Sequence, residues 1–354
     1  MLLEIFLRSD AALVASICQR WRSLALSYSQ FWTSIQINTL SASSIALGKL
    51  HSERSRDCLI NIVFVMGKAR ENEHQLLRMH ANLSNAIDLL MSAICRIQQF
   101  VVDYRLVGSI FSQLPDAPYH FPQLRSLKIQ YRNGTGATKI LPSNVKVPAL
   151  KELHLSNHPC FTAGAFRNNP FPYSSISDLR LSVCSVRSVI VLLVHLKQVE
   201  ILQLADIYEF DSVSRINAEN MDWKMIGVRD GLLHYPSLRS LTIQMEQSIF
   251  QIFFQHTQFP NIKHLRIEQR AVQFTEQPFV ELWWPTFRNV TTLDISWSGS
   301  FPELFSGFES VKIVRLLECG IHVWTERSIQ MLVEFLPKSV DVLQLEDEVI
   351  WRRA

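Results

Sequence analysis

The sequence has few of the residues that most catalytic sites require. Its 354 residues include only 11 glycines and 6 cysteines, and the cysteines, at positions 18, 58, 95, 160, 184 and 319, form no CxxC pair. A glycine-rich phosphate loop, a GxSxG turn and an arrangement of Ser, His and acid are absent from it. We therefore expect a protein that is not an enzyme and has no cofactor. The cysteine spacing indicates a reduced chain, cytoplasmic or nuclear.

An excess of one charge and a long apolar run are also absent. Lys and Arg number 35 against 32 Asp and Glu, for a net charge of +3, so electrostatics favours neither nucleic acid nor a membrane surface as a partner. The longest apolar run, from Val189 to Val194, is too short to cross a bilayer. We expect neither nucleic acid nor membrane among the partners.

A metal site is suggested only by His154, His158 and Cys160. Structural zinc needs four converging ligands, and no fourth ligand accompanies these three. We therefore expect no metal. Cys184 and Cys319 are also expected to be buried core thiols rather than nucleophiles, because of their place in the repeat described next.

A six-residue pattern, Leu150-Lys-Glu-Leu153-His-Leu155, recurs along the chain. Its last three residues alternate apolar, polar and apolar, as in a strand with one buried face. Ten copies, the first of them weaker, begin at residues 97, 124, 150, 176, 199, 238, 262, 290, 311 and 340, which lie 21 to 39 residues apart. The segments after several copies have helical spacing, so the pattern predicts strands that alternate with helices.

Two copies carry more of the pattern, because Cys184 and Cys319 follow at the place of an inward Asn or Cys. Residues 97 to 348 therefore resemble leucine-rich repeats of the irregular, helix-backed kind. The resemblance implies an α/β fold: a curved solenoid with a parallel sheet on its concave side and helices outside.

Residues 1–38 stand apart from the repeats. Leu13, Ile17, Cys18, Trp21 and Ala25 belong to one apolar stripe at helical spacing, with polar residues on the other side. One interpretation is a hydrophobic cap that closes one end of the repeat array.

The other interpretation comes from a resemblance. Leu2-Leu3-Glu4-Ile5-Phe6-Leu7 and Ile17-Cys18-Gln19-Arg20-Trp21-Arg22 resemble two parts of an F-box of the fungal type, without its opening L-P-x-E turn. The resemblance implies that this incomplete F-box docks on a Skp-type adaptor and cullin complex, through Ile5, Phe6, Leu13, Ile17 and Trp21. The chain would then be the substrate-recognition subunit of an SCF-type cullin-RING ubiquitin ligase. The alternative is a leucine-rich-repeat scaffold or inhibitor without ligase coupling.

Residues 39–96 are expected to link the two parts as atypical first repeats, before a leucine-rich-repeat domain over 97–354. The spacing predicts a helix over 41–55 with Ile45, Leu47 and Leu50 facing inward, and a strand over 59–64. A long helix over 71–96 follows, with Met91 among its inward residues.

In the nine copies after the first, the residue between the last two apolar places should point away from the core. We call these nine positions the outward row: Lys128, His154, Arg180, Gln203, Thr242, Arg266, Asp294, Arg315 and Gln344. Lys128, His154, Arg180, Arg266 and Arg315 are basic, so they predict an acidic or phosphorylated target segment. On neighbouring strands, Lys128, His154 and Arg180 could converge on one group of that ligand. The alternative is a solvated row, neutralised by Glu152, Asp178, Glu268 and an acidic insertion after Leu204.

Overall fold

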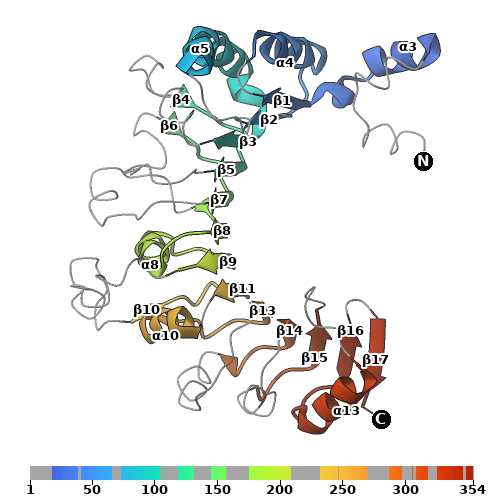
Figure 1. Cartoon of the computed structure of the whole chain (residues 1–354), viewed down its shortest axis with the longest axis vertical. Helices are drawn as coiled ribbons and strands as arrows, with labels where there is room; N and C mark the ends of the chain where they lie inside the picture. Colours follow the sequence, from blue (N-terminus) through green and yellow to red (C-terminus); the bar gives the residue numbers. More distant parts are fainter. Residues whose placement is uncertain are drawn as a thin grey trace. The chain divides into compact units, whose positions relative to one another are not determined.

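The chain is α/β, with thirteen strands in a mostly parallel sheet (Figure 1). The computed structural model describes residues 18–38, 41–65, 73–103, 106, 119–130, 145–156, 175–208, 232–245, 247–268, 287–296, 305, 308–317, 325–345 and 348–353. The chain divides into two compact units. Residues 1–135, 139–155 and 166–175 form the first, and residues 136–138, 156–165 and 176–354 form the second.

The first unit holds five strands of the sheet in chain order, paired in parallel where the register is defined. They are β1 (Ser34–Asn38), β2 (Ile60–Val65), β3 (Ile97–Asp103), β5 (Ser126–Gln130) and β7 (Glu152–Ser156). Its helices are α3 (Gln19–Ser27), η1 (Ser29–Trp32), α4 (Ala42–Arg54), α5 (Glu73–Ala93) and η2 (Ile94–Arg96). The short strands β4 (Tyr119–His120) and β6 (Val145–Lys146) pair separately.

The second unit holds eight strands of the sheet, also in chain order. They are β8 (Asp178–Ser182), β9 (Ile201–Ile207), β11 (Ser240–Met245), β13 (His264–Glu268), β14 (Thr292–Ser296), β15 (Ile313–Leu316), β16 (Val342–Leu345) and β17 (Glu348–Arg352). Only β17 is antiparallel to its neighbour. The short strands β10 (Leu233–His234) and β12 (Thr257–Gln258) pair with each other. The helices are α8 (Val186–His195), α10 (Gln247–His256) and α13 (Glu326–Phe335). No helix within the described residues is long and apolar enough to span a membrane.

The apolar places of the repeated pattern form the core. The first and fourth places of all ten copies are buried, from Ile97 and Phe100 to Val340 and Leu343. The sixth place is buried in nine copies and half-buried in the last, at Leu345. In nine of the ten copies the first place lies before the strand begins, so the chain enters these strands already packed against the core. In the first copy, Ile97 is itself the first residue of β3. Cys184 is buried as predicted, and Cys319 lies outside the described residues.

The helix α4 corrects the predicted inward face. Ile45 is buried, but Leu47 is 45% exposed, and Gly48 and Ser52 face inward instead. A Cβ atom on Gly48 would lie 3.0 Å from Leu89 Cδ2 and 3.1 Å from Ile35 Cγ2. The helix therefore approaches β1 and α5 through its glycine, which turns the adjacent Leu47 outward. On α5, Met91 is likewise exposed and the prediction there was wrong.

A proline turn precedes several of the strands. Pro122, Pro148, Pro236 and Pro260 each lie in a turn just before a strand, where a proline ends the preceding element without loss of a strand hydrogen bond. Side-chain amides link successive turns in the second unit: Asn261 Nδ2 donates to the carbonyl of Pro236 at 2.8 Å, and Asn289 Nδ2 to that of Pro260 at 2.7 Å. Each of these turns is thereby tied to the one before it.

A core substitution tests the assignment of the strands. Leu265 is fully buried on β13, whereas Ile201 at the start of β9 is 37% exposed. Leu265→Ala should lower the free energy of unfolding by about 2–5 kcal/mol, through lost burial and an uncollapsed cavity. Ile201→Ala should change it by about 0.5 kcal/mol or less. Urea unfolding of both variants measures this, and equal losses would contradict the assignment.

Candidate functional site

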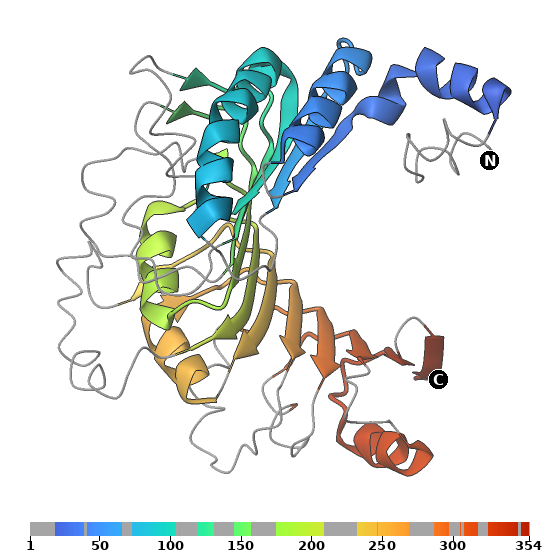
Figure 2. The same cartoon turned by 45° about the horizontal axis from the view of Figure 1, so that its top comes forward.

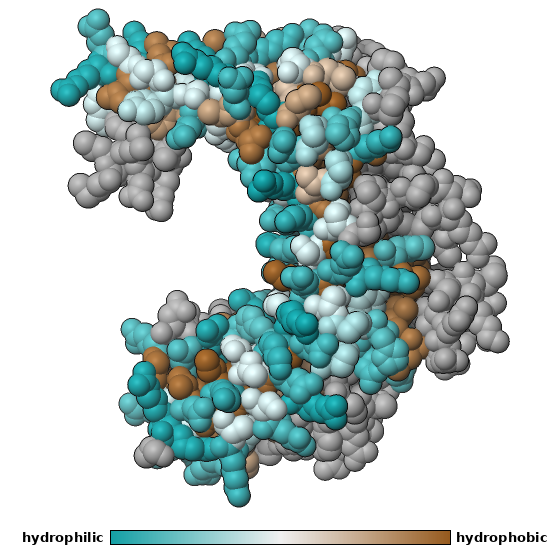
Figure 3. All heavy atoms as spheres, turned by 180° about the vertical axis from the view of Figure 1, so that it is seen from behind, coloured by the Kyte–Doolittle hydropathy of each residue, from teal (hydrophilic) through white to brown (hydrophobic). Residues whose placement is uncertain are grey.

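One face of the strands is covered by helices and the other carries the outward row. In the first unit α4 packs against α5 and β1, as the contacts of Gly48 show (Figure 1). In the second unit, α8 and α10 lie on one side of β8–β13 (Figure 2). We call the face that carries the outward row the open face. On the side of the molecule that Figure 3 shows, the described residues are mostly hydrophilic, with hydrophobic side chains scattered among them.

In the second unit the outward row is aligned residue for residue. The registers of β8 to β16 place Arg180 opposite Gln203, then Thr242, Arg266, Asp294, Arg315 and Gln344 in turn. Since neighbouring strands lie about 4.8 Å apart, seven side chains cross the sheet in one line. The alternation read from the sequence therefore brings together residues that are far apart in the chain.

In the first unit Lys128 on β5 is aligned with Val101 on β3 and Val63 on β2, so its neighbours on these strands are apolar. His154 is half-buried on β7. Lys128 and His154 belong to the first unit and Arg180 to the second. That all three bind one group of a ligand stays a prediction.

Three arginines of the outward row are paired with carboxylates. Arg180 binds Asp178 on its own strand through two hydrogen bonds, of 3.1 and 2.9 Å. On β13, Arg266 Nε donates to Glu268 Oε1 at 2.6 Å. Arg315 NH1 lies 3.7 Å from Asp294 Oδ1 on the neighbouring strand. Asp178 and Glu268 were expected to neutralise the row, and Asp294 is a third carboxylate that does so. The row is therefore closer to neutral than its five basic positions suggest.

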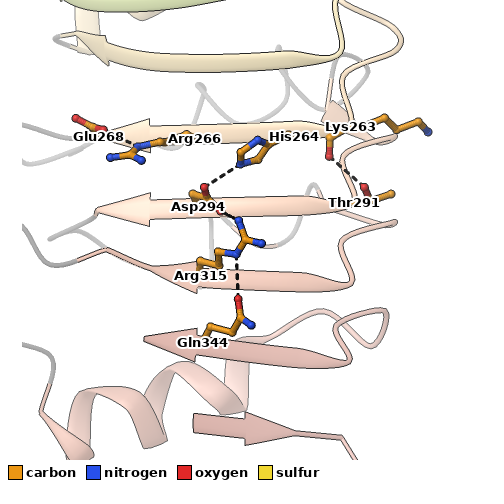
Figure 4. A network of polar contacts seen from close by, with 8 residues as sticks. All are labelled: Lys263, His264, Arg266, Glu268, Thr291, Asp294, Arg315 and Gln344. Carbon is orange, nitrogen blue, oxygen red and sulfur yellow. Dashed lines mark hydrogen bonds and ion pairs between the residues drawn. The ribbon is translucent and has the colours of Figure 1, made fainter. Parts of the chain in front are cut away.

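Asp294 is the centre of the polar network that Figure 4 shows across β13–β16. Its Oδ2 lies 2.8 Å from Nε2 of His264, and Arg315 Nε in turn donates to Gln344 Oε1 at 2.9 Å. The side chain of Asp294 is only 6% exposed. Asp294 lies on the predicted face of its strand. Its exposure is low because it lies between the longer side chains of His264 and Arg315.

Two buried side-chain oxygens on β14 have no hydrogen-bond partner among the described residues. Asp294 Oδ1 and Ser296 Oγ are both buried and unsatisfied. They lie two residues apart on β14, and hence on the same face of the strand. Buried polar atoms are nearly always hydrogen-bonded, so two adjacent exceptions call for an explanation.

The chemistry that this arrangement supports is binding by hydrogen bonds. The described residues contain no group of three or more His, Cys, Asp or Glu side chains that could hold a metal ion. The network offers guanidinium and amide donors beside carboxylate and hydroxyl oxygens. Such groups recognise polar parts of another molecule.

The polar contacts of His264 and the burial of Ser296 on this face were not predicted from the sequence. Both face the same way as the outward row, two places from Arg266 and Asp294, so strand alternation could have identified them. Which partners they contact depends on side-chain conformations across strands, and the sequence carries no signal for these.

Of residues 1–38, the structure describes only 18–38. Ile5, Phe6, Leu13 and Ile17 lie outside the described residues, so their adaptor-binding role stays a prediction. The predicted stripe is wrong at Cys18, which is exposed and extended, with φ of −157°. Its carbonyl accepts the first hydrogen bond of α3, from Arg22 at 2.9 Å, so the helix begins at Gln19.

Trp32 joins α3 to α4. Its Nε1 donates to the carbonyl of Ala25 in α3 at 2.7 Å. Its ring meets His51 of α4 edge-on at 4.9 Å, and the guanidinium of Arg54 lies 4.4 Å from the ring centre. Trp21 packs against the same buried pair of Ala25 and Trp32. The end of α3 is thus part of the first unit's core.

A substitution at Trp32 tests this junction. Trp32→Phe removes the donor to the Ala25 carbonyl and part of a buried ring, and should lower the free energy of unfolding by about 1–3 kcal/mol. Hydrogen exchange in α3 should rise with it. Tyr28→Phe, at an exposed neighbour, should leave both unchanged and is the matched control. Unaltered exchange in α3 of the Trp32 variant would contradict the junction.

Comparison with known proteins gives little to set beside these features. No family model and no curated protein matches the chain. Among solved structures it is similar to a chain of the Rad7 and Elc1 complex in yeast, at 12% identity over 89% of this chain and 70% of that one, with a TM-score of 0.40. The function therefore has to be argued from the chain's own residues.

Proposed function

We propose that the chain is a leucine-rich-repeat solenoid that binds a target protein on its open face, as the substrate-recognition subunit of an SCF-type cullin-RING ubiquitin ligase. Residues 1–38, as an incomplete F-box, would dock on the Skp-type adaptor. The aligned outward row of the second unit carries the proposal. Solenoids use extended faces of this kind to bind other proteins.

The recurrence of one strand pattern supports the repeat assignment. Strands in chain order and parallel pairing with matched registers are what stacked repeats produce, and the proline turns recur with them. The amides of Asn261 and Asn289 make the same hydrogen bond in successive turns. This equivalence is more specific than a count of leucines.

The N-terminal helix supports the adaptor-docking part. The F-box resemblance assigns Trp21 as a packing anchor, and Trp21 does pack on the Ala25 and Trp32 pair. Leu26, which is 44% exposed, leaves an apolar side chain on the other side of α3. An amphipathic helix held at one side and apolar on another is suited to a helical partner.

Co-purification with a Skp-type adaptor tests the proposal. The full chain should retain the adaptor, and a version extended by an L-P-x-E turn should retain more. The double variant Ile5→Asp with Phe6→Asp should reduce retention at least tenfold, because it places charges in an apolar interface. Leu47→Asp, at an exposed leucine of α4, is the matched control and should bind as the wild type does.

Absence of adaptor binding by both the chain and its extended version would overturn the ligase part. The chain would then be a repeat scaffold or inhibitor, with residues 1–38 as a cap. Circular dichroism of each variant separates loss of binding from loss of fold.

A further inference from the structure

We infer that the polar network around Asp294 binds the main chain of an extended, uncharged peptide segment. This inference rests on the proposed function of the open face and specifies the chemistry of the target. It differs from the acidic or phosphorylated segment that the basic residues of the outward row predict.

The network has acceptors that no described donor satisfies. Asp294 Oδ2 is hydrogen-bonded to the ring nitrogen Nε2 of His264. Asp294 Oδ1 is buried and has no hydrogen bond. Ser296 Oγ, two residues along the strand, is also buried and has none. Arg315 NH1, at 3.7 Å from Oδ1, is too far away for a hydrogen bond. A carboxylate oxygen in this situation requires an N–H or O–H from elsewhere.

The same network has donors to spare. Arg266 and Arg315 use their Nε atoms for Glu268 and Gln344, and their side chains remain 42% and 38% exposed. Within the described part of the chain, the terminal amino groups of both make no hydrogen bond. A guanidinium has five N–H groups, so each arginine can still donate to a ligand oxygen.

Local charge selects against an ionic ligand. Arg266 is balanced by Glu268 and Arg315 by Asp294, so the four groups sum to zero. A cationic ligand group that reached Asp294 Oδ1 would meet the guanidinium of Arg315 at the same oxygen. An anionic group that reached the arginines would meet Asp294 between them. A neutral group with both a donor and an acceptor meets neither difficulty.

The peptide bond is such a group. Arg266, Asp294 and Arg315 occupy three neighbouring strands in register, so a donor, an acceptor and a donor follow one another at about 4.8 Å. An extended peptide crossing these strands presents N–H and C=O groups along its edge. One N–H can donate to Asp294 Oδ1 while carbonyls on either side accept from the arginines. Thr242 and Gln203 continue the row with uncharged hydrogen-bonding groups.

A peptide selection followed by backbone modification tests the inference. Random 12-residue peptides displayed on phage are selected on the full chain, and the enriched peptides are synthesised. Their binding to the wild type, Asp294→Asn and Arg315→Gln is then measured. Arg327→Gln is the matched control, since Arg327 is exposed on α13 and lies outside the outward row. N-methylation of each peptide amide in turn removes one N–H at a time.

We expect enriched peptides with few charged residues. Their affinities should be at least tenfold lower for Asp294→Asn and Arg315→Gln, and unchanged for Arg327→Gln. One or two N-methylated positions should lose binding to a similar degree. Acidic peptides whose binding falls steeply with salt, or binding insensitive to N-methylation, would overturn the inference. So would a crystal structure of the peptide complex in which a water molecule alone satisfies Asp294 Oδ1.

The outcomes separate this inference from the proposed function. Peptides bound independently of Asp294 would refute the inference and leave protein binding by the chain intact. Enrichment of no peptide would refute the inference, while adaptor co-purification would still decide the ligase part. If Asp294→Asn fails to fold, Arg315→Gln and the N-methyl series decide the outcome alone.

Discussion

The lateral hydrogen bonds between successive strands are the constraint on which the rest of the second unit depends. They begin one step before each strand: Lys263 N donates to the carbonyl of Arg239, Thr291 N to that of Lys263, and Lys312 N to that of Thr291, all at 2.8–2.9 Å. Because these bonds recur at equivalent positions, they set one register for all strands. Side chains alternate along each strand, so a single register produces both a continuous core and a continuous outward row.

The strands and the two faces of the sheet could be predicted from the sequence, because period-two alternation reports directly which side chains share a face. Burial of Leu153 follows from the same pattern, and burial of Cys184 from its place in the repeat. Helix faces were less predictable. The hydrophobic spacing predicted that Leu47 faces the core, but Gly48 does, because only a residue without a side chain fits the close approach of the helix. Hydrophobic spacing does not report this steric requirement.

The candidate site was predictable only in part. The row and its residue types could be read from the sequence, but the state of its charges could not. Arg180 and Arg266 turn toward carboxylates two places away on their own strands, and His264 reaches diagonally to Asp294. These choices depend on side-chain conformations that compete within a small free-energy range. A row that is basic by composition thus becomes a mixed set of donors and acceptors.

The asparagine amides that tie one proline turn to the next have a consequence for how the chain can change over time. Each of these bonds joins only neighbouring repeats, and no described atom of the outward row takes part in them. The groups that hold successive turns together are therefore separate from the groups that a partner would contact. A substitution on the open face therefore leaves the bonds between successive turns in place.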